Sequence, residues 1–174
     1  MSISALILAK NEEEMIEDCL KQLDFLDEII VLDTGSKDRT IDIAKKYTKS
    51  VIKSSVSDFD KNRTALARMA KSDWLLYLDA DERLTQELIT EIRQVINKSD
   101  YSAFNFPRKN IILGKWLRHG GWWPDYVPRL FKKSKLIEWR GRVHESPRIE
   151  GDFGYLKNPM THYTARDLGK MFEK

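Results

Sequence analysis

Short apolar runs alternate with amphipathic stretches over residues 1–100, and this alternation constrains the fold more than any other feature of the sequence. Ile3–Ala9, Glu28–Asp33 and Trp74–Asp79 are rich in large apolar residues, which is typical of strands buried on both faces. The segment after the first run places its apolar residues on one helical face: Met15, Ile16, Cys19, Leu20 and Leu23. Strands that alternate with helices predict an α/β fold with a largely parallel central sheet and right-handed crossovers.

Side chains that can accept hydrogen bonds from free backbone N–H groups mark the expected helix starts. Asn11, with Glu14 three residues later, predicts a capping box before the first helix. Ser36 or Asp38 is expected to open the second helix, and Thr85 to cap the last helix of this half. The remaining elements expected here are a brief strand at 51–52 and a helix at 58–71.

The pattern changes after about residue 100. Short strands are predicted at 102–106, 127–133, 139–144 and 160–164 in a mixed region of the sheet, and 108–124 is predicted to be a shaped loop. The charge also changes, because residues 1–100 carry 15 Lys and Arg against 20 Asp and Glu, whereas 101–174 carry 15 against 7. The basic half is either a solvated face or a surface that meets an anionic partner.

Length and composition fit one soluble domain of 174 residues, with 41% hydrophobic and 33% charged residues. No apolar run reaches the roughly 18 to 20 residues that a membrane-spanning helix needs. The first apolar run has no basic segment before it, so we expect a strand and not a signal peptide, in a cytoplasmic protein. The single cysteine, Cys19, is expected to pack in the core.

The ends of the predicted strands carry unusual polar clusters. Asp79 and Asp81 are two residues apart in DADE, so in an extended chain both point to the same side. Such a pair can hold a hard divalent cation through oxygen ligands, or a cation with one residue and a sugar hydroxyl with the other. The alternative is a polar loop whose carboxylates only favour the N-terminus of the next helix. With AKNEE and LDTGSKD at neighbouring strand ends, the sequence predicts a nucleotide crevice with a metal at one side.

Four motifs together resemble the family 2 glycosyltransferases of the GT-A fold: LILAKNEEEMIEDCL, DEIIVLDTGSKDRTIDIA, SDWLLYLDADERLTQEL and LRHGGWWPDYVPRLFKK. The resemblance extends from Ile3 to about Tyr163 and is greatest to the branch of lipopolysaccharide-core glucosyltransferase-like proteins. It implies a hexosyltransferase with a nucleotide-diphosphate sugar donor, a UDP-sugar favoured, and a divalent metal, Mn²⁺ or Mg²⁺. It also implies a single GT-A domain over 1–174, with a nucleotide-binding half (1–100) and an acceptor-side half (101–174).

The resemblance assigns roles residue by residue. Asp81 matches the direct metal ligand of the family's DxD motif, with Asp79 nearer the ribose or also on the metal, and His162 resembles a late histidine that serves as a further ligand. A neutral imidazole is a reasonable ligand for Mn²⁺, although a lone histidine is more often simply hydrogen-bonded. The residues implied to bind the nucleotide-sugar are Ala9, Asn11, Glu12, Asp33, Arg63 and Asp79. The alternative for Arg63 is a solvated helical arginine.

The resemblance also implies a carboxylate base in the second half. Glu145 and Asp125 are the two candidates, and Glu145 is favoured because its strand corresponds best to the one before the family's acceptor-side acid. The chain lacks the ED pair common elsewhere in the family, so a structural role stays open for each. His119 and His144 are expected to shape loops or orient neighbours. Four tryptophans could pack in the core or form a sugar-binding wall, and three arginines could bind phosphate or face solvent: Trp116, Trp122, Trp123 and Trp139, with Arg118, Arg129 and Arg142.

Two rival functions remain open from the sequence. A nucleotidyltransferase also uses a metal and a nucleotide, but usually with a Gly-rich basic loop that LAKNEEE lacks. A non-catalytic nucleotide- or sugar-binding module is the other rival, and no nucleic-acid-binding motif is recognised. The acceptor is expected to be a glycan, a lipid-linked sugar or another hydroxyl, with peripheral contact at the inner face of a membrane and a homodimer left open. Lys174 falls inside a predicted helix, so the chain is either cut short on its acceptor side or a natural minimal form.

Overall fold

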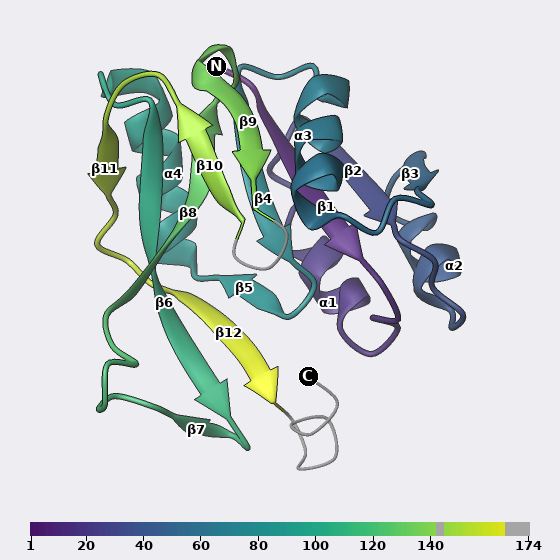
Figure 1. Cartoon of the computed structure of the whole chain (residues 1–174). Coiled ribbons are helices and arrows are strands. Elements are labelled where there is room, and N and C mark those ends of the chain that lie inside the picture. The colour runs from purple at the N-terminus through teal and green to yellow at the C-terminus, as the bar shows by residue number, and fades with distance from the viewer. Residues whose placement is uncertain (142–144, 166–174) are drawn as a thin grey trace.

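Four parallel strands form the regular side of one large sheet (Figure 1). They are β1 (Ile3–Ala9), β2 (Glu28–Asp33), β3 (Ser50–Lys53) and β4 (Trp74–Asp79), in the spatial order β3-β2-β1-β4. The computed structural model describes residues 1–141 and 145–165 of the chain. The chain runs from β1 through β2 to β3 on one side and then returns to place β4 on the other side of β1. A crevice is therefore expected where the carboxyl ends of β1 and β4 meet.

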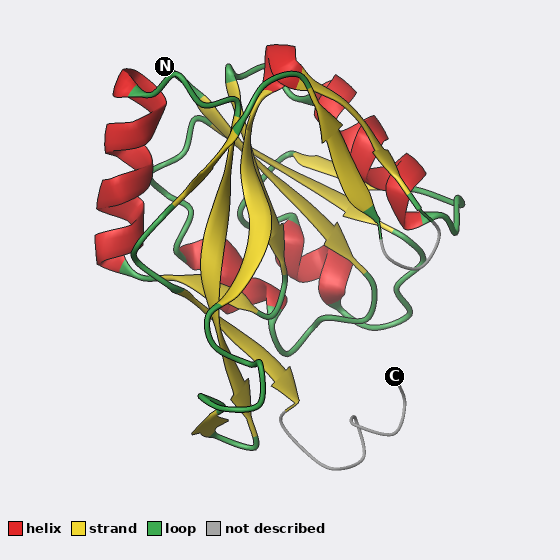
Figure 2. Ribbon diagram, turned by 60° about the vertical axis from the view of Figure 1, so that its left-hand side comes forward, coloured by secondary structure: helices red, strands yellow, loops and turns green. Residues whose placement is uncertain are grey.

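Helices cover both faces of these strands (Figure 2). On one face, α1 (Ile16–Lys21), α2 (Thr40–Ala44) and α4 (Gln86–Lys98) pack on a core that includes Ile7 and Leu76. On the other face, α3 (Phe59–Met69) packs with β9 (Leu136–Arg140) on a second core around Leu6 and Tyr77. The strands β1 and β4 therefore bury both faces, as their unbroken apolar sequences predict. Within the described residues, no helix has the length and apolarity needed to cross a membrane.

The second half extends the same sheet in mixed orientation. Next to β4 come β8 (Asp125–Lys132), β6 (Ala103–Ile112), β12 (Met160–Ala165) and β5 (Glu82–Leu84), in that order. The pairs β4–β8, β8–β6 and β12–β5 are antiparallel, whereas β6 and β12 are parallel. The shorter strands are β7 (Lys115–Trp116) and β11 (Phe153–Tyr155), which pair with β6, and β10 (Ser146–Ile149), which pairs with β9; a 3₁₀ turn, η1, covers Lys133–Lys135. These strands bring side chains from the second half to the carboxyl end of β4.

The predicted helix starts are only partly confirmed. Thr85 caps α4 as expected, its side chain accepting a hydrogen bond from the Leu88 N–H at 3.1 Å. The capping box at Asn11 is wrong, because α1 begins only at Ile16, after Met15, with no side-chain cap. Asn11 instead has a left-handed backbone with φ of 55°, and its Oδ1 accepts a hydrogen bond from the Lys37 N–H.

The strands of the second half are longer and more numerous than predicted. The segment 108–124 is not all loop, because β6 continues to Ile112 and turns back into β7. The strands β10 and β11 were not predicted either, nor was β5 of the first half, since each has only three or four residues. Short strands carry little local signal, and their pairing partners lie far away in the sequence. Of the strand predicted at 139–144, β9 ends at Arg140, and 142–144 lie outside the described residues.

Candidate active site

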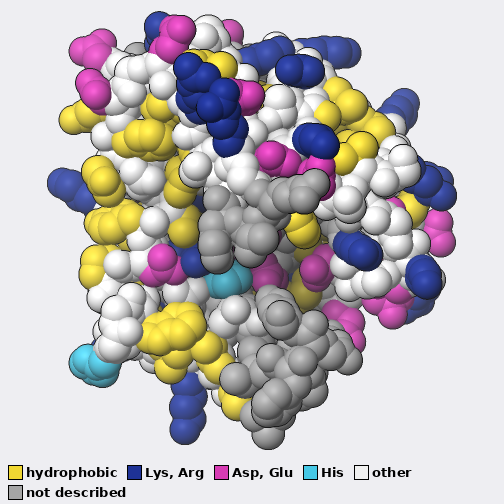
Figure 3. All heavy atoms as spheres, in the orientation of Figure 1, with side chains coloured by type: hydrophobic (Ala, Val, Ile, Leu, Met, Phe, Trp, Pro, Cys, Tyr) yellow, Lys and Arg dark blue, Asp and Glu magenta, His cyan; other side chains and the backbone are white. Residues whose placement is uncertain are grey.

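The carboxyl ends of β1 and β4 border a cavity of about 330 Å³. It contains seven of the residues predicted for the site, namely Ala9, Glu12, Arg63, Asp79, Asp81, Glu145 and His162. In Figure 3, acidic side chains and a histidine come together near the centre of the face shown. A larger cavity of about 530 Å³ lies at the opposite end of β4, beside Asp73 and three lysines. The smaller cavity is the candidate site because the convergent carboxylates and imidazole lie there.

Asp79, the first carboxylate of DADE, is held by two arginines. Its Oδ1 accepts a hydrogen bond from Arg63 Nη2 at 3.1 Å, and its Oδ2 accepts one from Arg129 Nη2 at 2.7 Å. Burial acts to raise the pKa of this carboxyl, but the guanidinium groups of Arg129 and Arg63 outweigh it and hold the pKa well below the usual range. Asp79 is therefore ionised at neutral pH, with both oxygens already engaged.

Glu82 forms the buried end of the same charge network. It begins β5 and is fully buried, and its Oε1 accepts a hydrogen bond from Arg129 Nη2 at 2.6 Å. Its Oε2 accepts one from the Asp79 backbone N–H at 3.1 Å, which closes the DADE turn. Burial raises the pKa of Glu82, so the paired guanidinium of Arg129 is what makes a carboxylate tolerable at this position. Arg129, a candidate phosphate ligand from sequence, is 6% exposed and binds carboxylates.

Asp81, the second carboxylate of DADE, faces His162 of β12. The distance from His162 Nε2 to Asp81 Oδ2 is 3.3 Å, and the Tyr163 N–H donates to the Asp81 backbone carbonyl at 3.0 Å. Two ligands at right angles in an octahedral site, with bonds of about 2.1 Å, lie about 3 Å apart, so this pair fits a shared divalent cation. The described residues contain no group of three or more Asp, Glu, His or Cys side chains that could hold a metal. Further ligands would therefore come from the donor and from water.

Glu145 lines the cavity and is hydrogen-bonded to Arg63, which also lines it. Its Oε1 accepts a hydrogen bond from Arg63 Nε at 3.0 Å. Arg63 is 7% exposed, and its guanidinium lies over the rings of Trp139 and Tyr77, 5.0 and 5.7 Å from their centroids. Arg63 is thus a buried residue facing the site and not a solvated helical arginine. It joins a carboxylate of the first half to one of the second.

Asp125, the other candidate base, lies outside the lining of the cavity. Its Oδ2 accepts hydrogen bonds from Arg108 Nε at 2.8 Å and from Asn110 Nδ2 at 2.9 Å. Burial acts to raise the pKa of Asp125, but the hydrogen bonds from Asn110 and Arg108 hold it below the usual range. Such a carboxylate is a weak base, so the geometry favours Glu145, and a catalytic role for either residue stays a prediction.

Two of the predicted nucleotide-binding residues hold the loops of the site. Asp33 is 1% exposed, and its Oδ1 accepts hydrogen bonds from the N–H groups of Gly35 and Ser36 at 2.9 and 3.0 Å. This turn needs Gly35, which has φ of 101°. Asn11 bridges the first loop to the second, since its N–H donates to Ser36 Oγ at 2.9 Å. Direct contacts of Asp33 and Asn11 with a nucleotide stay predictions, and neither residue lines the cavity.

The model of the family described as glycosyl transferase family 2 matches residues 4–151. The chain belongs to this family. A TPR repeat-containing protein of Synechococcus elongatus is 36% identical over 145 residues, which cover 82% of this chain and 34% of that protein. The chain spans about a third of the length of the curated relatives that it matches first.

Solved structures of two other proteins resemble the chain at low sequence identity. TarS from S. aureus, residues 1–349 in complex with UDP, superposes with a TM-score of 0.71 and 15% identity, over 99% of this chain and 63% of that one. Glucosyl-3-phosphoglycerate synthase from Mycobacterium tuberculosis, in complex with Mn²⁺, UDP and glucosyl-3-phosphoglycerate, gives 0.53 and 21%, over 62% and 44%. At these identities the likeness establishes the GT-A fold.

Three residues of this family 2 site were missed or misjudged from the sequence. Glu82, Arg129 and Asn110 are all buried and polar, and each lies on a strand. On β6, the residues Phe104 and Phe106 face the core, and the same alternation continues through Arg108 and Asn110. A polar residue on the buried face of a strand needs a partner, and this signal was present in FNFPRKN. It was overlooked because 108–124 was interpreted as a loop.

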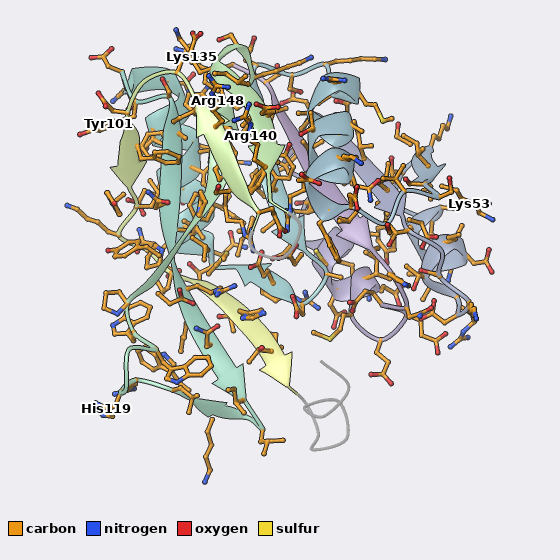
Figure 4. All side chains as sticks on the ribbon, viewed as in Figure 1. Lys53, Tyr101, His119, Lys135, Arg140 and Arg148 are labelled. Atoms are coloured by element: carbon orange, nitrogen blue, oxygen red, sulfur yellow. The ribbon has the colours of Figure 1, made fainter. Side chains whose placement is uncertain are left out.

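The tryptophans Trp139 and Trp116 lie in different places, the second core and the β6–β7 hairpin. Trp139 packs in the second core against Tyr77 and Phe131, with ring centroids 5.1 and 5.5 Å away, so core packing is confirmed for it. Trp116, on β7, is flanked by Lys109 Nζ and Arg118 Cζ at 4.5 and 4.0 Å from its ring centroid. A sugar-binding wall at the β6–β7 hairpin stays a prediction. His119 lies near β7 in Figure 4, and His144 and Arg142 fall outside the described residues.

Part of the excess positive charge of the second half is paired with carboxylates of the protein itself. Arg108 and Arg129 are in the site network. Lys135, Arg140 and Arg148 lie around the β9–β10 hairpin (Figure 4), and each has an acidic neighbour. Lys135 lies 3.6 Å from Glu150, and both Arg140 and Arg148 lie within 3.5 Å of Glu138. These pairs favour a solvated face over an anion-binding patch at the hairpin.

Proposed function

We propose that the protein is a metal-dependent, inverting glycosyltransferase that moves a sugar from a nucleotide-diphosphate sugar to an acceptor hydroxyl. The observation that carries this proposal is the Asp81–His162 pair, 3.3 Å apart, in the cavity at the carboxyl ends of β1 and β4. A UDP-sugar is the favoured donor, because structures with the same fold are complexes with UDP, one of them also with Mn²⁺. A role in cell-envelope glycan or lipopolysaccharide synthesis is supported by the sequence resemblance alone.

Asp81 and His162 are the residues that would hold the divalent cation. An oxygen and an imidazole nitrogen suit Mn²⁺, and the carboxylate also suits Mg²⁺. When bound, the cation supplies Lewis-acid neutralisation of the charge that develops on the leaving diphosphate. Asp79 is less suited to the cation, since both of its oxygens accept hydrogen bonds from arginines. We assign Asp79 to the nucleotide side of the site, together with Ala9 and Glu12, which line the same cavity.

Glu145 is the proposed base. Its carboxylate accepts the proton of the acceptor hydroxyl while the acceptor oxygen forms a bond to the anomeric carbon. The bond between that carbon and the phosphate oxygen breaks in the same step, and the nucleoside diphosphate leaves with the bonding pair. Attack from the side opposite the leaving group inverts the configuration. Arg63 orients Glu145 by its hydrogen bond of 3.0 Å and is itself fixed against Trp139.

Isothermal titration with UDP, GDP, dTDP and CDP, each with and without Mn²⁺, tests the donor site on wild type and Asp81→Ala. We expect one nucleotide to bind in a Mn²⁺-dependent manner, and the Mn²⁺ dependence to disappear in Asp81→Ala. No binding of any nucleotide with Mn²⁺ present would refute the proposal. Glu145→Gln separates catalysis from binding: a transferase loses sugar transfer and keeps nucleotide affinity, whereas a binding module shows no transfer in wild type. A nucleotidyltransferase would instead release pyrophosphate from a nucleoside triphosphate and a sugar phosphate.

A further inference from the structure

A row of polar side chains crosses three neighbouring strands beside the proposed cation site. The register pairs Arg108 of β6 with Asp125 of β8, and Asn110 of β6 with His162 of β12. Arg108 and Asn110 are two residues apart on one strand, so they point to the same face. The contacts follow the register: Asn110 Nδ2 donates to Asp125 Oδ2 at 2.9 Å, and His162 Nδ1 lies 2.7 Å from Asn110 Oδ1.

The donor and acceptor atoms of these side chains fix which partner donates in each hydrogen bond of this row. The guanidinium of Arg108 has only donors, and two of them meet Asp125 Oδ2, at 2.8 Å from Nε and 2.7 Å from Nη2. Asp125 is therefore the acceptor in its contact with Asn110, which must turn its NH₂ group toward Asp125 and its carbonyl oxygen toward His162. A carbonyl oxygen can only accept, so the proton of the imidazole lies on Nδ1.

We propose that Asn110 is a positioning residue that holds His162 with its proton on Nδ1, so that the Nε2 lone pair is presented beside Asp81 Oδ2. This inference rests on the proposed function, because it assigns the pair to a divalent cation. Asn110 is 1% exposed, so its amide is shielded from solvent. A histidine ligand commonly donates its other N–H to an oxygen that fixes its tautomer and orientation. Here the oxygen belongs to an amide that is itself held in place by Asp125 and Arg108.

The competing description is an imidazole whose Nδ1 carries no proton and whose Nε2 donates its N–H to Asp81. Nitrogen NMR of the wild-type protein distinguishes the two, and His162→Gln assigns the signal among the three histidines of the chain. We expect His162 Nδ1 to give the signal of a protonated nitrogen, as its contact with the Asn110 carbonyl oxygen requires. An unprotonated Nδ1 would overturn the proposal, and this measurement needs no variant at Asn110 to fold.

Mn²⁺ affinity in the presence of UDP, measured by electron paramagnetic resonance, provides the second readout. Asn110→Leu removes the acceptor of the Nδ1 proton, and we expect about 10- to 100-fold weaker Mn²⁺ binding. Asn105→Leu is the matched control, because the alternation of side chains along β6 puts Asn105 on the opposite face of the same strand. The exchange N110D/D125N keeps one amide, one carboxylate and an acceptor at Nδ1, so it should bind Mn²⁺ with most of the wild-type affinity.

The outcomes separate this inference from the proposed function. Wild type that binds no Mn²⁺ with any nucleotide refutes both. Wild type that binds Mn²⁺ normally, together with Asn110→Leu that binds equally well, refutes the role of Asn110 and leaves the proposed function intact. Loss of affinity in Asn110→Leu, with retained affinity in the exchanged pair and in Asn105→Leu, supports the positioning role, provided that Asn110→Leu unfolds at the same urea concentration as Asn105→Leu. An Asn110→Leu protein that loses affinity only together with its fold, or an exchanged pair that also loses affinity, would contradict it.

Discussion

The two halves of the chain contribute different chemistry to one site. Residues 1–100 form the regular parallel part of the sheet, and its last strand, β4, ends in the carboxylates of DADE. The mixed sheet of residues 101–165 supplies Arg129 and His162, which face them, and Asn110, which contacts His162 from behind. The first half therefore places the negative charges, and the second half supplies the partners that differ between Asp79 and Asp81: Arg129 and His162.

Asp79 and Asp81 show this division within three residues. Asp79 is bound by Arg63 from α3 and Arg129 from β8, whereas Asp81 faces His162 from β12. A motif of two carboxylates two residues apart does not itself say which one holds a cation. The cross-strand partners distinguish them, and these are contributed by strands far along the chain.

The largest expected effect tests the buried part of this comparison. Arg129→Met leaves Glu82 and Asp79 without their shared guanidinium, and Glu82 is fully buried. Breaking a buried ion pair by removing one partner costs about 3–5 kcal/mol, so we expect a loss of that size in the free energy of unfolding measured in urea. Arg140→Met is the matched control from the same half. The Arg140–Glu138 pair is solvent-exposed, and its loss should cost less than about 1 kcal/mol. Equal losses would contradict a special role for Arg129.

A glycine from each half gives the next effect. Gly35 and Gly151 have φ of 101° and 100°, so a side chain strains both backbones similarly. A Cβ at Gly35 meets nothing within 4 Å, whereas one at Gly151 would overlap Ser102 Oγ and lie 3.2 Å from Ser102 Cβ. We expect Gly35→Ala to cost about 1–2 kcal/mol and Gly151→Ala at least about 1 kcal/mol more. Thermal unfolding of the two variants measures the difference, and a smaller loss at Gly151 would contradict the packing of 151 against 102.

The smallest effect concerns the core beneath Asp79. Burial raises the pKa of the Cys19 thiol to about 12, above the value of about 8.5 for an unfolded cysteine. Above pH 8.5 the unfolded chain binds fewer protons than the native one, so stability falls as pH rises. Between pH 8 and 9.5 we expect wild type to lose about 1 kcal/mol more than Cys19→Ala. The native thiol should also resist alkylation at pH 8, and rapid labelling under native conditions would contradict its burial.

The sequence predicted the first half well because its signals are local. The strands β1, β2 and β4 have the predicted bounds, and the Thr85 cap of α4 is confirmed. Each rests on a continuous apolar run or a single capping residue. The Asn11 cap failed for a tertiary reason, since Asn11 hydrogen-bonds the backbone of Lys37 in the neighbouring loop.

The second half and the inner shell of the site were harder to predict, because they depend on pairing between distant segments. Glu82 lies opposite His162, and Arg108 opposite Asp125, only after β5, β6, β8 and β12 have found their registers. The candidates Arg63, Asp81, Glu145 and His162 do lie together at the cavity. No local pattern indicates that Arg129 binds both Asp79 and Glu82, since each of these contacts joins residues more than 40 positions apart.

Mn²⁺ affinity in the presence of UDP, compared between Asp81→Asn and Asp79→Asn, tests most directly the claim that the two carboxylates have separate roles. Both substitutions remove one negative charge from the same turn, so each serves as the control for the other. We expect Asp81→Asn to lose Mn²⁺ binding, and Asp79→Asn to keep it within about tenfold of wild type, as for a residue outside the ligand shell. Loss of Mn²⁺ binding in Asp79→Asn, with retention in Asp81→Asn, would contradict the assignment of the cation to Asp81 and His162.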